Sequence, residues 1–520
     1  MIRFSALSDR ITVGTTQTTD LDITTQDCII GSGCGGATLA LRLAEAGRDV
    51  VILEQGGLHT AESGDLDQRE DDMLAKIDGG RGLHASEDLT INFTYGRTVG
   101  GASVHYWADS YRTPADRLDM WAEEFRIEHH SLAELEPHFA RIERDLHIEP
   151  APDHLLNPLN RRLEQATETL GWHGHRVPQA RSGCIGSGYC MQGCAYDAKQ
   201  SQLVTSVPRA LELGAHLICD ARATTLVRNG KRITAVEGNL LDRGSGRTRA
   251  RFRIGAERVF VAAGGFQTAP LLLRNGFGEE LPALGARLYC NPCVMAHGFF
   301  AEPVDQFRGI PAGWGIDQFR LHRYDDNGAY IEGGYLLMPN QLQAGTLAAV
   351  LPGIGGDHQT LMARFRHFGG AIAWIDDLDP GRIEWDRNGR IRWHFSIGPR
   401  DRLVCRDAMR KGAQWLLAAG AEEVHLGDRA RTVVRTPAEL DVIDRFDFGP
   451  TDVVLAGPHP AGAAPMGRDP RTAVVDSEHR VFGTDNLYIA DPSVFPTAVS
   501  VDPSVTIMAF SHRLADLLSS

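Results

Sequence analysis

One stretch near the N-terminus constrains the fold more than any other. Residues 27–57 read DCIIGSGCGGATLALRLAEAGRDVVILEQGG. An apolar run, a glycine-rich turn, a leucine-rich segment and a second apolar run follow one another in that order. This order predicts a β-strand, a tight turn, a helix and a second, parallel strand. A chain built around such a unit is expected to be an α/β protein with a largely parallel sheet.

The glycines and the acidic residue of this stretch indicate nucleotide binding. Gly31 suits the tight turn, Gly33 allows the backbone to approach a pyrophosphate, and Gly36 allows close packing of helix and strand. The helix N-terminus would present unpaired N–H groups to the phosphates. Glu54 follows the second strand, where a carboxylate accepts the ribose hydroxyls. The unit predicts a dinucleotide without choosing between NAD and FAD.

Composition narrows the class of partner. With 42% hydrophobic and 23% charged residues, the 520-residue chain is typical of globular proteins. A net charge of −14 and the lack of a sustained Lys/Arg run argue against a nucleic-acid partner. No apolar run is long enough for a membrane span, and residues 1–26 are polar, without the apolar core of a secretory signal. We therefore expect a cytoplasmic protein with a short N-terminal leader segment.

The rest of the chain supplies further elements around this unit. Residues 95–107, YGRTVGGASVHYW, contain adjacent glycines that suit backbone lying against a flat cofactor. The sequence pattern of residues 116–180 predicts helices, and we expect them to form one wall of a cap. The run VFVAAGG at 259–265 predicts a buried strand beside the first one, and residues 281–449 predict an antiparallel sheet with a hairpin turn at 387–389.

The C-terminal segment carries a family resemblance. The sequence GPHPAGAAPMG at 457–467 and LYIADPSVFPT at 487–497, together with the first unit, GRTVGGAS and VFVAAGG, resembles the glucose-methanol-choline family of FAD-dependent oxidoreductases. The resemblance implies FAD and a discontinuous Rossmann-like FAD-binding domain made of residues 27–115, 181–280 and 450–520. It also implies a substrate domain of residues 116–180 and 281–449, with an antiparallel sheet and helices.

The resemblance assigns a set of residues to the cofactor. His105 matches a position that bears a covalent flavin bond in the pyranose-oxidising branch, whereas related dehydrogenases carry a histidine there without the bond; we expect the latter. The implied FAD-binding residues are Gly31, Gly33, Gly36, Glu54, Arg97, Gly100, Gly101, Ser103, His105, Ala263, Gly264, Asp491 and Pro503.

The resemblance also implies the chemistry. His459 falls on the catalytic histidine of the family and would take the proton of a small-molecule alcohol while FAD accepts the hydride. Electrons would then pass to oxygen or to an acceptor, including an acceptor protein. Asp502 stands where the family usually has a second histidine or an asparagine. Its role stays open between holding His459 protonated, acting as the base, and positioning as a neutral group.

The cysteines raise the possibility of a metal cluster, and the scaffold allows a second type of reaction. The nine cysteines are an odd number, which argues against a disulfide framework. The spacing of Cys184, Cys190 and Cys194 resembles the ligands of an iron–sulfur cluster in the glucose dehydrogenase branch, although a close-packed glycine loop explains it equally. A flavin-dependent lyase or decarboxylase on the same scaffold is the alternative to alcohol oxidation.

Overall fold

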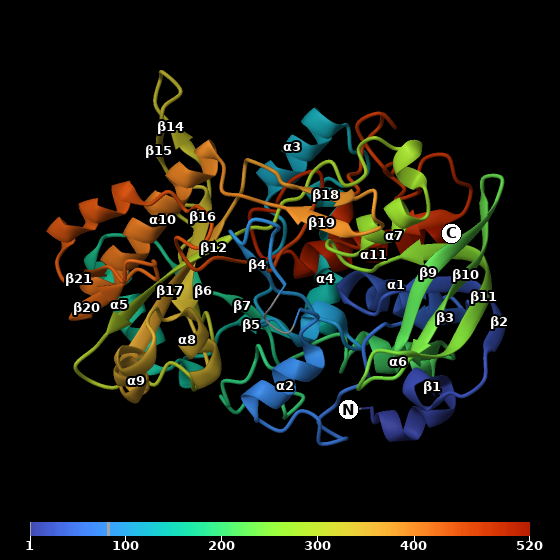
Figure 1. The fold of residues 1–520 in the computed structure, drawn as a ribbon, viewed down its shortest axis with the longest axis horizontal. Helices are drawn as coiled ribbons and strands as arrows, with labels where there is room; N and C mark the ends of the chain where they lie inside the picture. The colour runs from blue at the N-terminus through green and yellow to red at the C-terminus, as the bar shows by residue number, and fades with distance from the viewer. Residues whose placement is uncertain (1, 81–83, 520) are drawn as a thin grey trace.

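Two β-sheets lie apart in the molecule, and helices pack beside and between them (Figure 1). The computed structural model describes residues 2–80 and 84–519. Residues 1, 81–83 and 520, which fall inside the predicted leader and FAD-binding ranges, lie outside the described residues. The mixed α/β architecture confirms the predicted fold class.

The first sheet has eight strands in the described part of the chain. Its main path runs β1-β8-β3-β2-β11-β10-β9, and β23 pairs with β11 beyond the point where β10 leaves. The strands are β1 (Ile11–Val13), β2 (Leu21–Ile30), β3 (Val50–Leu53), β8 (His216–Cys219), β9 (Ala221–Asn229), β10 (Arg232–Leu241), β11 (Thr248–Val261) and β23 (Leu487–Ile489).

The parallel half of this sheet contains the strands that the glycine motif predicts. Strand β2 pairs in parallel with β3 on one side and with β11 on the other, and Ile30 lies opposite both Leu53 and Val261. The predicted strand at 259–261 is thus the neighbour of the first strand. The segment expected as a leader contributes β1 and the start of β2 to this sheet. It is therefore part of the first sheet, and not a separate segment ahead of it.

The second sheet is antiparallel along its main path, β16-β17-β12-β20-β21. Strand β22 joins β12, and β4 joins β22 in parallel. The strands are β4 (Asn92–Phe93), β12 (Cys293–Phe299), β16 (Tyr335–Asn340), β17 (Phe368–Ile375), β20 (Glu423–His425), β21 (Val433–Val434) and β22 (Ala456–Gly457). Strands β4 and β22 come from ranges predicted for the FAD-binding domain, so the two predicted domains share this sheet.

Four short two-stranded sheets complete the β-structure of the described residues. Among them, β18 and β19 form the predicted hairpin, with Gly389 in the left-handed region at φ +73°. The pairs are β5 (Ile148–Pro150) with β7 (Pro178–Ala180), β6 (His175–Arg176) with β13 (Trp314–Gly315), β14 (Arg323–Tyr324) with β15 (Tyr330–Glu332), and β18 (Arg382–Trp385) with β19 (Ile391–His394).

The helices follow local sequence signals. Helix α4 begins with a capping box formed by Ser131 and Glu134, and its buried face carries Leu135, Phe139 and Ile142. The α-helices are α1 (Cys34–Glu45), α2 (Glu70–Ile77), α3 (Ala115–Phe125), α4 (Leu132–Asp145), α5 (Pro158–Thr169), α6 (Ser206–Glu212), α7 (Thr268–Arg274), α8 (Ala344–Val350), α9 (Gly355–Ala363), α10 (Pro399–Ala418) and α11 (Ser504–Ser519). None of the helices in the described ranges is long and apolar enough to cross a membrane.

The helices of residues 116–180 serve packing more than the formation of a cap. Helix α4 packs on α11, and α5 packs on α10, which lies across the second sheet. Of the described residues between 116 and 180, none lines the central cavity. The predicted helices are present, and a role for them in a cap stays a prediction.

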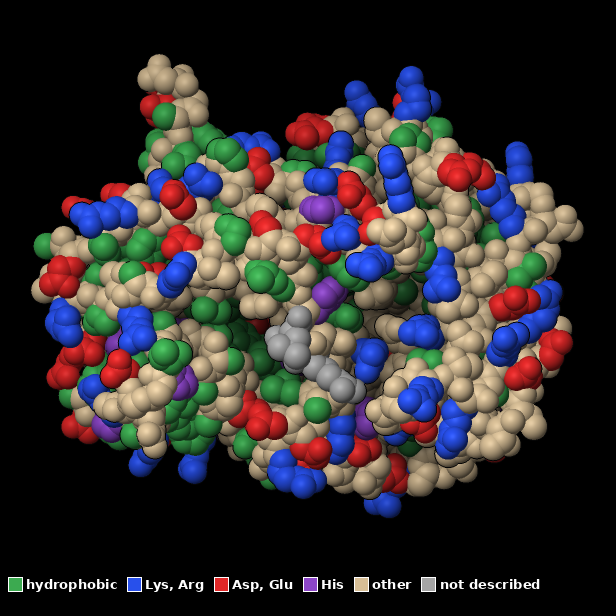
Figure 2. Space-filling view, viewed as in Figure 1, with side chains coloured by type: hydrophobic (Ala, Val, Ile, Leu, Met, Phe, Trp, Pro, Cys, Tyr) green, Lys and Arg blue, Asp and Glu red, His purple; other side chains and the backbone are tan. Residues whose placement is uncertain are grey.

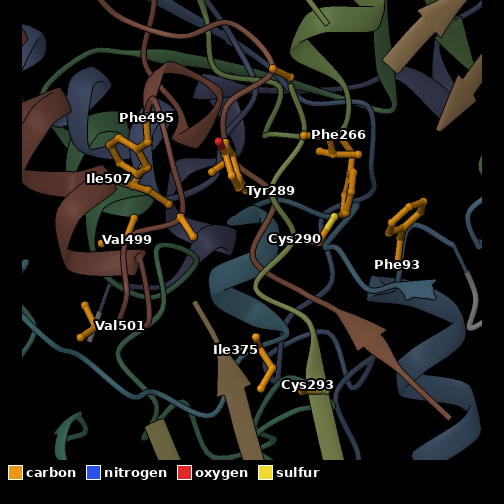
Figure 3. Packing of buried hydrophobic residues seen from close by; sticks show 14 of the residues in the cluster. Phe93, Phe266, Tyr289, Cys290, Cys293, Ile375, Phe495, Val499, Val501 and Ile507 are labelled. Carbon is orange, nitrogen blue, oxygen red and sulfur yellow. The ribbon is translucent and has the colours of Figure 1, made fainter. Parts of the chain in front are cut away.

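One continuous apolar core joins the second sheet to the C-terminal segment. In Figure 3, Cys290, Cys293 and Ile375 lie at the ends of β12 and β17, and Phe495 and Ile507 lie in the C-terminal segment. All five belong to a single cluster of buried side chains. This shared core fixes the position of the C-terminal segment relative to the second sheet.

Candidate active site

A cavity of about 860 Å³ is lined by residues from both sheets. Figure 2 shows a hollow with hydrophobic walls near the middle of the molecule, between the regions of the two sheets. Its volume lies within the usual range for small-molecule and cofactor sites, about 300–1,000 Å³. The glycine turn of 31–35, Glu54 and the strand end at 262–265 line it from the first sheet, while His459 lines it beside the second.

The glycines of the first turn permit backbone contacts that no side chain would tolerate. A Cβ atom on Gly31, which has φ +110°, would lie 2.1 Å from the carbonyl oxygen of Ala262. A Cβ on Gly36 would lie 2.0 Å from the carbonyl oxygen of Gly31. A Cβ on Gly35 would lie 1.8 Å from the carbonyl oxygen of Ala490. These three glycines hold α1 against the ends of β11 and β23, and Gly35 is a contact that the motif does not predict.

The position of Gly33 fits a bound pyrophosphate. Gly33 is the N-cap of α1, and no side chain caps this helix start. A Cβ on Gly33 would meet only the Cα of Gly101, at 3.8 Å, and would otherwise project into the cavity. Uncapped N–H groups at a helix start bind phosphate. The residues present therefore fit the phosphates of FAD.

Glu54 lines the same cavity at the end of β3. Its Oε2 accepts hydrogen bonds from the backbone N–H and the hydroxyl of Ser32, at 3.1 and 2.7 Å. Its Oε1 accepts from the Gly56 N–H at 2.8 Å. Burial raises the pKa of Glu54, while the bonds from Ser32 and Gly56 oppose this effect. The carboxylate is therefore fixed where the motif predicts a ribose contact.

Most of the predicted cofactor residues meet at this cavity. Gly36, Arg97 and Gly100 do not line it. Gly100 lies behind the wall, where its N–H donates to the Ser32 hydroxyl at 3.0 Å. The predicted residues that line the cavity are Gly31, Gly33, Glu54, Gly101, Ser103, His105, Ala263, Gly264, Asp491 and Pro503.

His105 lines the cavity and has one ring nitrogen without a hydrogen-bond partner among the described residues. Its Nδ1 lies 2.5 Å from the carbonyl oxygen of Met191, so Nδ1 carries the proton and donates. Its Nε2 is buried and has no hydrogen-bond partner among the described residues. Burial lowers the pKa of His105, which keeps the ring neutral. An unpartnered buried nitrogen beside the cavity fits a cofactor that supplies its contact. The expectation that His105 carries no covalent flavin bond stays a prediction.

Asp491 ties the end of β23 to the end of β11. Its Oδ2 accepts from the Gly264 N–H at 3.0 Å and from the Thr268 hydroxyl, and its Oδ1 accepts from the Ser493 N–H at 2.9 Å. Asp491 thereby caps the short helix η8 (Pro492–Val494). Asp491, which the resemblance assigns to the flavin site, therefore holds the backbone of this cavity wall in place through its carboxylate.

His459 lies directly after β22 and faces the cavity from the side of the second sheet. Its backbone N–H donates to the Cys290 carbonyl at 3.3 Å, which places it beside the start of β12. Its ring packs against Trp374 with centroids 5.1 Å apart. Burial lowers the pKa of His459 to about 3, so the imidazole is neutral at physiological pH.

Asn291 sets the tautomer of His459. The Asn291 side-chain nitrogen donates to the Ile375 carbonyl at 2.5 Å, which leaves its Oδ1 as an acceptor. His459 Nδ1 lies 2.7 Å from that oxygen and must therefore carry the ring proton. The lone pair is consequently on Nε2, the nitrogen nearer to Asp502. A neutral imidazole with this tautomer can accept a proton at Nε2.

Sequence reasoning missed Asn291. It lies between Cys290 and Cys293, and both cysteines are buried core residues. Asp377 holds this turn, because its carboxylate accepts from the N–H groups of Cys290 and Asn291 at 2.9 and 3.1 Å. Asn291 adopts φ +45°, a conformation that asparagine tolerates better than most residues. The only usable signal was an asparagine next to a proline in a turn.

Asp502 is buried opposite His459. Its Oδ1 lies 3.5 Å from His459 Nε2, and its Oδ2 has no partner among the described residues. Burial raises the pKa of Asp502 well above its ordinary value, and the neighbouring Asp109 carboxyl raises it further. Burial also raises the pKa of Asp109 to about 7. Two buried carboxyls that interact cannot both ionise easily, so this environment favours the protonated form of Asp502.

The cysteine loop contacts two cations, Arg181 and Lys199, through Cys190. Arg181 donates to Cys190 Sγ at 3.1 Å, and the Gly186 N–H donates to Cys184 Sγ at 3.4 Å. Among the described residues, the sulfurs of Cys184, Cys190 and Cys194 do not form a group of ligand atoms within 4.8 Å of one another. The iron–sulfur cluster gains no support from this arrangement.

Lys199 anchors that loop to the cavity wall. Its ammonium donates to the carbonyls of Val104, Tyr106 and Cys190 at 2.7, 2.9 and 2.5 Å. Burial lowers its pKa to about 8. Because Met191 follows Cys190, the same clamp holds the carbonyl that orients His105.

Comparison with known proteins agrees with this geometry. The two family models described as GMC oxidoreductase match residues 29–293 and 378–511. The chain belongs to the GMC oxidoreductase family. It is therefore an FAD-dependent oxidoreductase, and the predicted family is confirmed.

Similar GMC oxidoreductases come from bacteria and plants. An uncharacterized GMC-type oxidoreductase of Mycobacterium tuberculosis is 30% identical over 94% of this chain and 75% of its own length. An uncharacterized GMC-type oxidoreductase of Sinorhizobium fredii is 28% identical over 96% of this chain and 95% of its own. A long-chain-alcohol oxidase of Arabidopsis thaliana is 25% identical over 94% of this chain and 67% of its own.

Solved structures share the fold. Pyridoxine 4-oxidase from Mesorbium loti superposes with a TM-score of 0.68 at 18% identity, over 95% of this chain and 99% of that one. Formate oxidase from Aspergillus oryzae superposes with a TM-score of 0.70 at 15% identity, over 96% and 98% of the two chains. At these identities the likeness establishes the architecture alone.

Proposed function

We propose that this GMC oxidoreductase oxidises the CH–OH group of an alcohol to a carbonyl, with His459 as the proton acceptor. The observation that carries the proposal is the tautomer of His459, which is neutral, hydrogen-bonded to Asn291 through Nδ1, and free at Nε2 beside the cavity. When bound, FAD supplies an acceptor for the hydride. The electrons then pass to oxygen or to another acceptor.

The residues of the chain divide the remaining work. His459 Nε2 takes the hydroxyl proton of the alcohol, and Asn291 Oδ1 stabilises the imidazolium that forms. Protonated Asp502 donates a hydrogen bond, the role that an asparagine would fill at this position. Gly31, Gly33 and Glu54 hold the nucleotide through backbone and carboxylate contacts. Asp502 is thus a positioning acid, and His459 is the base.

The walls of the cavity favour an apolar substrate. On the side of the second sheet the cavity is lined by Met295, Leu342, Val350, Ile372 and Trp374, which are all hydrophobic. Asn340 adds a polar group to this wall, because its buried Oδ1 has no partner among the described residues and can accept one hydrogen bond. We propose an alcohol with a largely apolar body. The similarity to a plant long-chain-alcohol oxidase supports this class and favours oxidation over the lyase and decarboxylase alternative.

A chain-length series tests the substrate class. Purified holoenzyme would be mixed anaerobically with primary alcohols of increasing length, and with glucose as the polar comparison, while flavin absorbance is followed. Each buried methylene contributes about 0.8 kcal/mol, so we expect kcat/KM to rise about fourfold per added CH₂ until the cavity is full. The product should be the aldehyde. Preference for glucose would overturn the apolar class, and product formation without any flavin reduction would favour a lyase or decarboxylase.

A further inference from the structure

A cluster of two histidines and an aspartate lies far along α11 from the active site. His138 comes from α4, while His512 and Asp516 are four residues apart on α11 and so share one helix face. Among the described residues, this is the only group of three or more His, Cys, Asp or Glu side chains whose ligand atoms all lie within 4.8 Å of one another. The mechanism proposed above does not use it.

The three ligand atoms converge on one point. His138 Nδ1 and His512 Nδ1 are 2.7 Å apart, and they lie 3.7 and 3.6 Å from Asp516 Oδ2. A tetrahedral zinc ion with bonds of 2.0–2.2 Å separates its ligand atoms by about 3.4 Å. Two of the three distances thus match closely, and the third requires the two rings to part by about 0.7 Å.

The protonation of the cluster leaves lone pairs available. Two Nδ1 atoms 2.7 Å apart cannot both carry protons, so at least one presents its lone pair to the other. Arg42 donates to Asp516 Oδ1 at 2.8 Å, and this contact leaves Oδ2 as the oxygen that faces the histidines. Arg42 and Glu45 are the charged neighbours on α1, and they also pair with each other.

The cluster is closed on the inside and open on the outside. The side chains of His138 and His512 are 12% and 8% exposed, whereas that of Asp516 is 43% exposed. An ion could therefore enter past Asp516, and water could complete its coordination.

We propose that His138, His512 and Asp516 form a binding site for a divalent transition metal, with zinc as the expected ion. Two imidazoles and one carboxylate are ligands that Zn²⁺ accepts in proteins, with a solvent molecule in the fourth position. The metal joins α4 to α11. His512 lies eight residues, about 12 Å, beyond the start of α11, so the role is structural and not catalytic.

The surroundings set a moderate affinity. His512 Nε2 is buried without a hydrogen-bond partner among the described residues. A ligating histidine is normally supported by a hydrogen bond at its second nitrogen, and losing that support costs about 10- to 100-fold in affinity. We therefore expect weaker binding than at a fully supported structural zinc site.

Zinc binding by the holoenzyme tests the proposal. The protein would carry no affinity tag, would be treated with chelator, and would be titrated with zinc chloride by calorimetry and by equilibrium dialysis with metal analysis. We expect one zinc per chain, together with a rise in Tm on loading. Alcohol turnover should be unchanged by zinc. Absence of bound zinc in the wild type would overturn the proposal.

Variants localise the site. His138→Ala and Asp516→Asn should each weaken binding at least tenfold and remove the zinc-dependent rise in Tm. Asp516→Asn changes only a partly exposed side chain, so it tests the site even if His138→Ala fails to fold. His154→Ala, at an exposed histidine of the same chain, is the matched control and should bind zinc as the wild type does. Equal affinity in Asp516→Asn and wild type would contradict the assignment.

Discussion

The two sides of the central cavity are built by different means. On the side of the first sheet, the glycine turn of one short stretch makes much of the wall, and its close approach to the ends of β11 and β23 is the dominant requirement. On the side of the second sheet, side chains from segments distant in the sequence meet, as His459 and Asn291 do. The comparison teaches that cofactor binding here rests on local sequence, whereas catalysis rests on tertiary placement.

The largest effect is expected from breaking the backbone wall. Gly36→Ala places a Cβ 2.0 Å from the Gly31 carbonyl oxygen, so α1 must move away from the sheet. Overpacking of this kind costs about 1–3 kcal/mol or more, and we expect loss of bound FAD together with lower stability. The measurement is FAD content per chain and the urea unfolding midpoint.

Two neighbouring glycines serve as controls for that variant. Gly33→Ala meets nothing closer than 3.8 Å, so it should keep the wild-type stability of the protein without FAD but lower FAD affinity. Gly47→Ala has no atom within 4 Å and should keep FAD, at a backbone cost of about 1 kcal/mol for its left-handed φ. Identical behaviour of Gly33→Ala and Gly47→Ala would contradict the proposed role of the α1 start.

The next largest effect is expected on activity, from a change on the side of the cavity beside the second sheet. Asn291→Ala removes the acceptor that fixes the His459 tautomer, and we expect kcat to fall about 10- to 100-fold, part of what a positioned base supplies. FAD content should stay at the wild-type level. Loss of activity with FAD retained would show that the side chains beside the second sheet serve the reaction and not FAD binding.

Asn291→Asp sharpens the same test. The carboxylate still accepts from His459 Nδ1, and its charge stabilises the imidazolium, so the pKa of His459 should rise. We expect most activity to return, with the acid limb of the pH–rate profile moved to higher pH. Equal losses of activity in Asn291→Ala and Asn291→Asp would show that the tautomer is not what matters.

A smaller effect is expected at Asp502. If this residue works as a neutral acid, Asp502→Asn should keep kcat/KM within about threefold at pH 7, which is ~0.7 kcal/mol. The raised pKa in the folded state means that the unfolded chain loses this proton first as pH rises. The stability advantage of Asp502→Asn over wild type should therefore grow from about pH 4 upward. A loss of activity comparable to that of a His459 variant would instead make Asp502 the base.

The smallest effect at neutral pH is expected on folding stability, from histidines that are buried in the neutral form. Burial lowers the pKa of His297 to about 3 and that of His479 to about 4. The unfolded chain takes up these protons near pH 6.5, so stability falls below that pH by about 1.4 kcal/mol per histidine and pH unit. Urea midpoints at several pH values measure this slope. His297→Gln should flatten it, and an unchanged slope would contradict the assignment.

The contrast between the walls also explains what could be predicted from sequence. Gly31, Gly33, Gly36 and Glu54 lie within one βαβ unit, so their arrangement follows from local periodicity and spacing. The pairing of Asn291 with His459 depends on the register of β12 against β22, which no local pattern encodes. The protonation of Asp502 depends on burial beside Asp109, and burial of that kind appears only once the fold is known.

Sequence reasoning did not predict the strands of the N-terminal segment. The run LDIT at the start of β2 alternates half-buried and exposed residues, as expected for a strand near the solvent. Its polarity suggested a leader, although its pairing with β11 makes it part of the first sheet. Polar alternation was the available signal for a strand.

The central claim is that His459 is the base, and anaerobic reduction of the flavin by substrate tests it most directly. Holoenzyme of wild type and of His459→Ala would be mixed with the best alcohol of the chain-length series, and the rate of flavin bleaching would be measured. The account predicts that the rate falls about 10²- to 10⁴-fold in His459→Ala while FAD stays bound at the wild-type ratio. A rate equal to that of the wild type would contradict it.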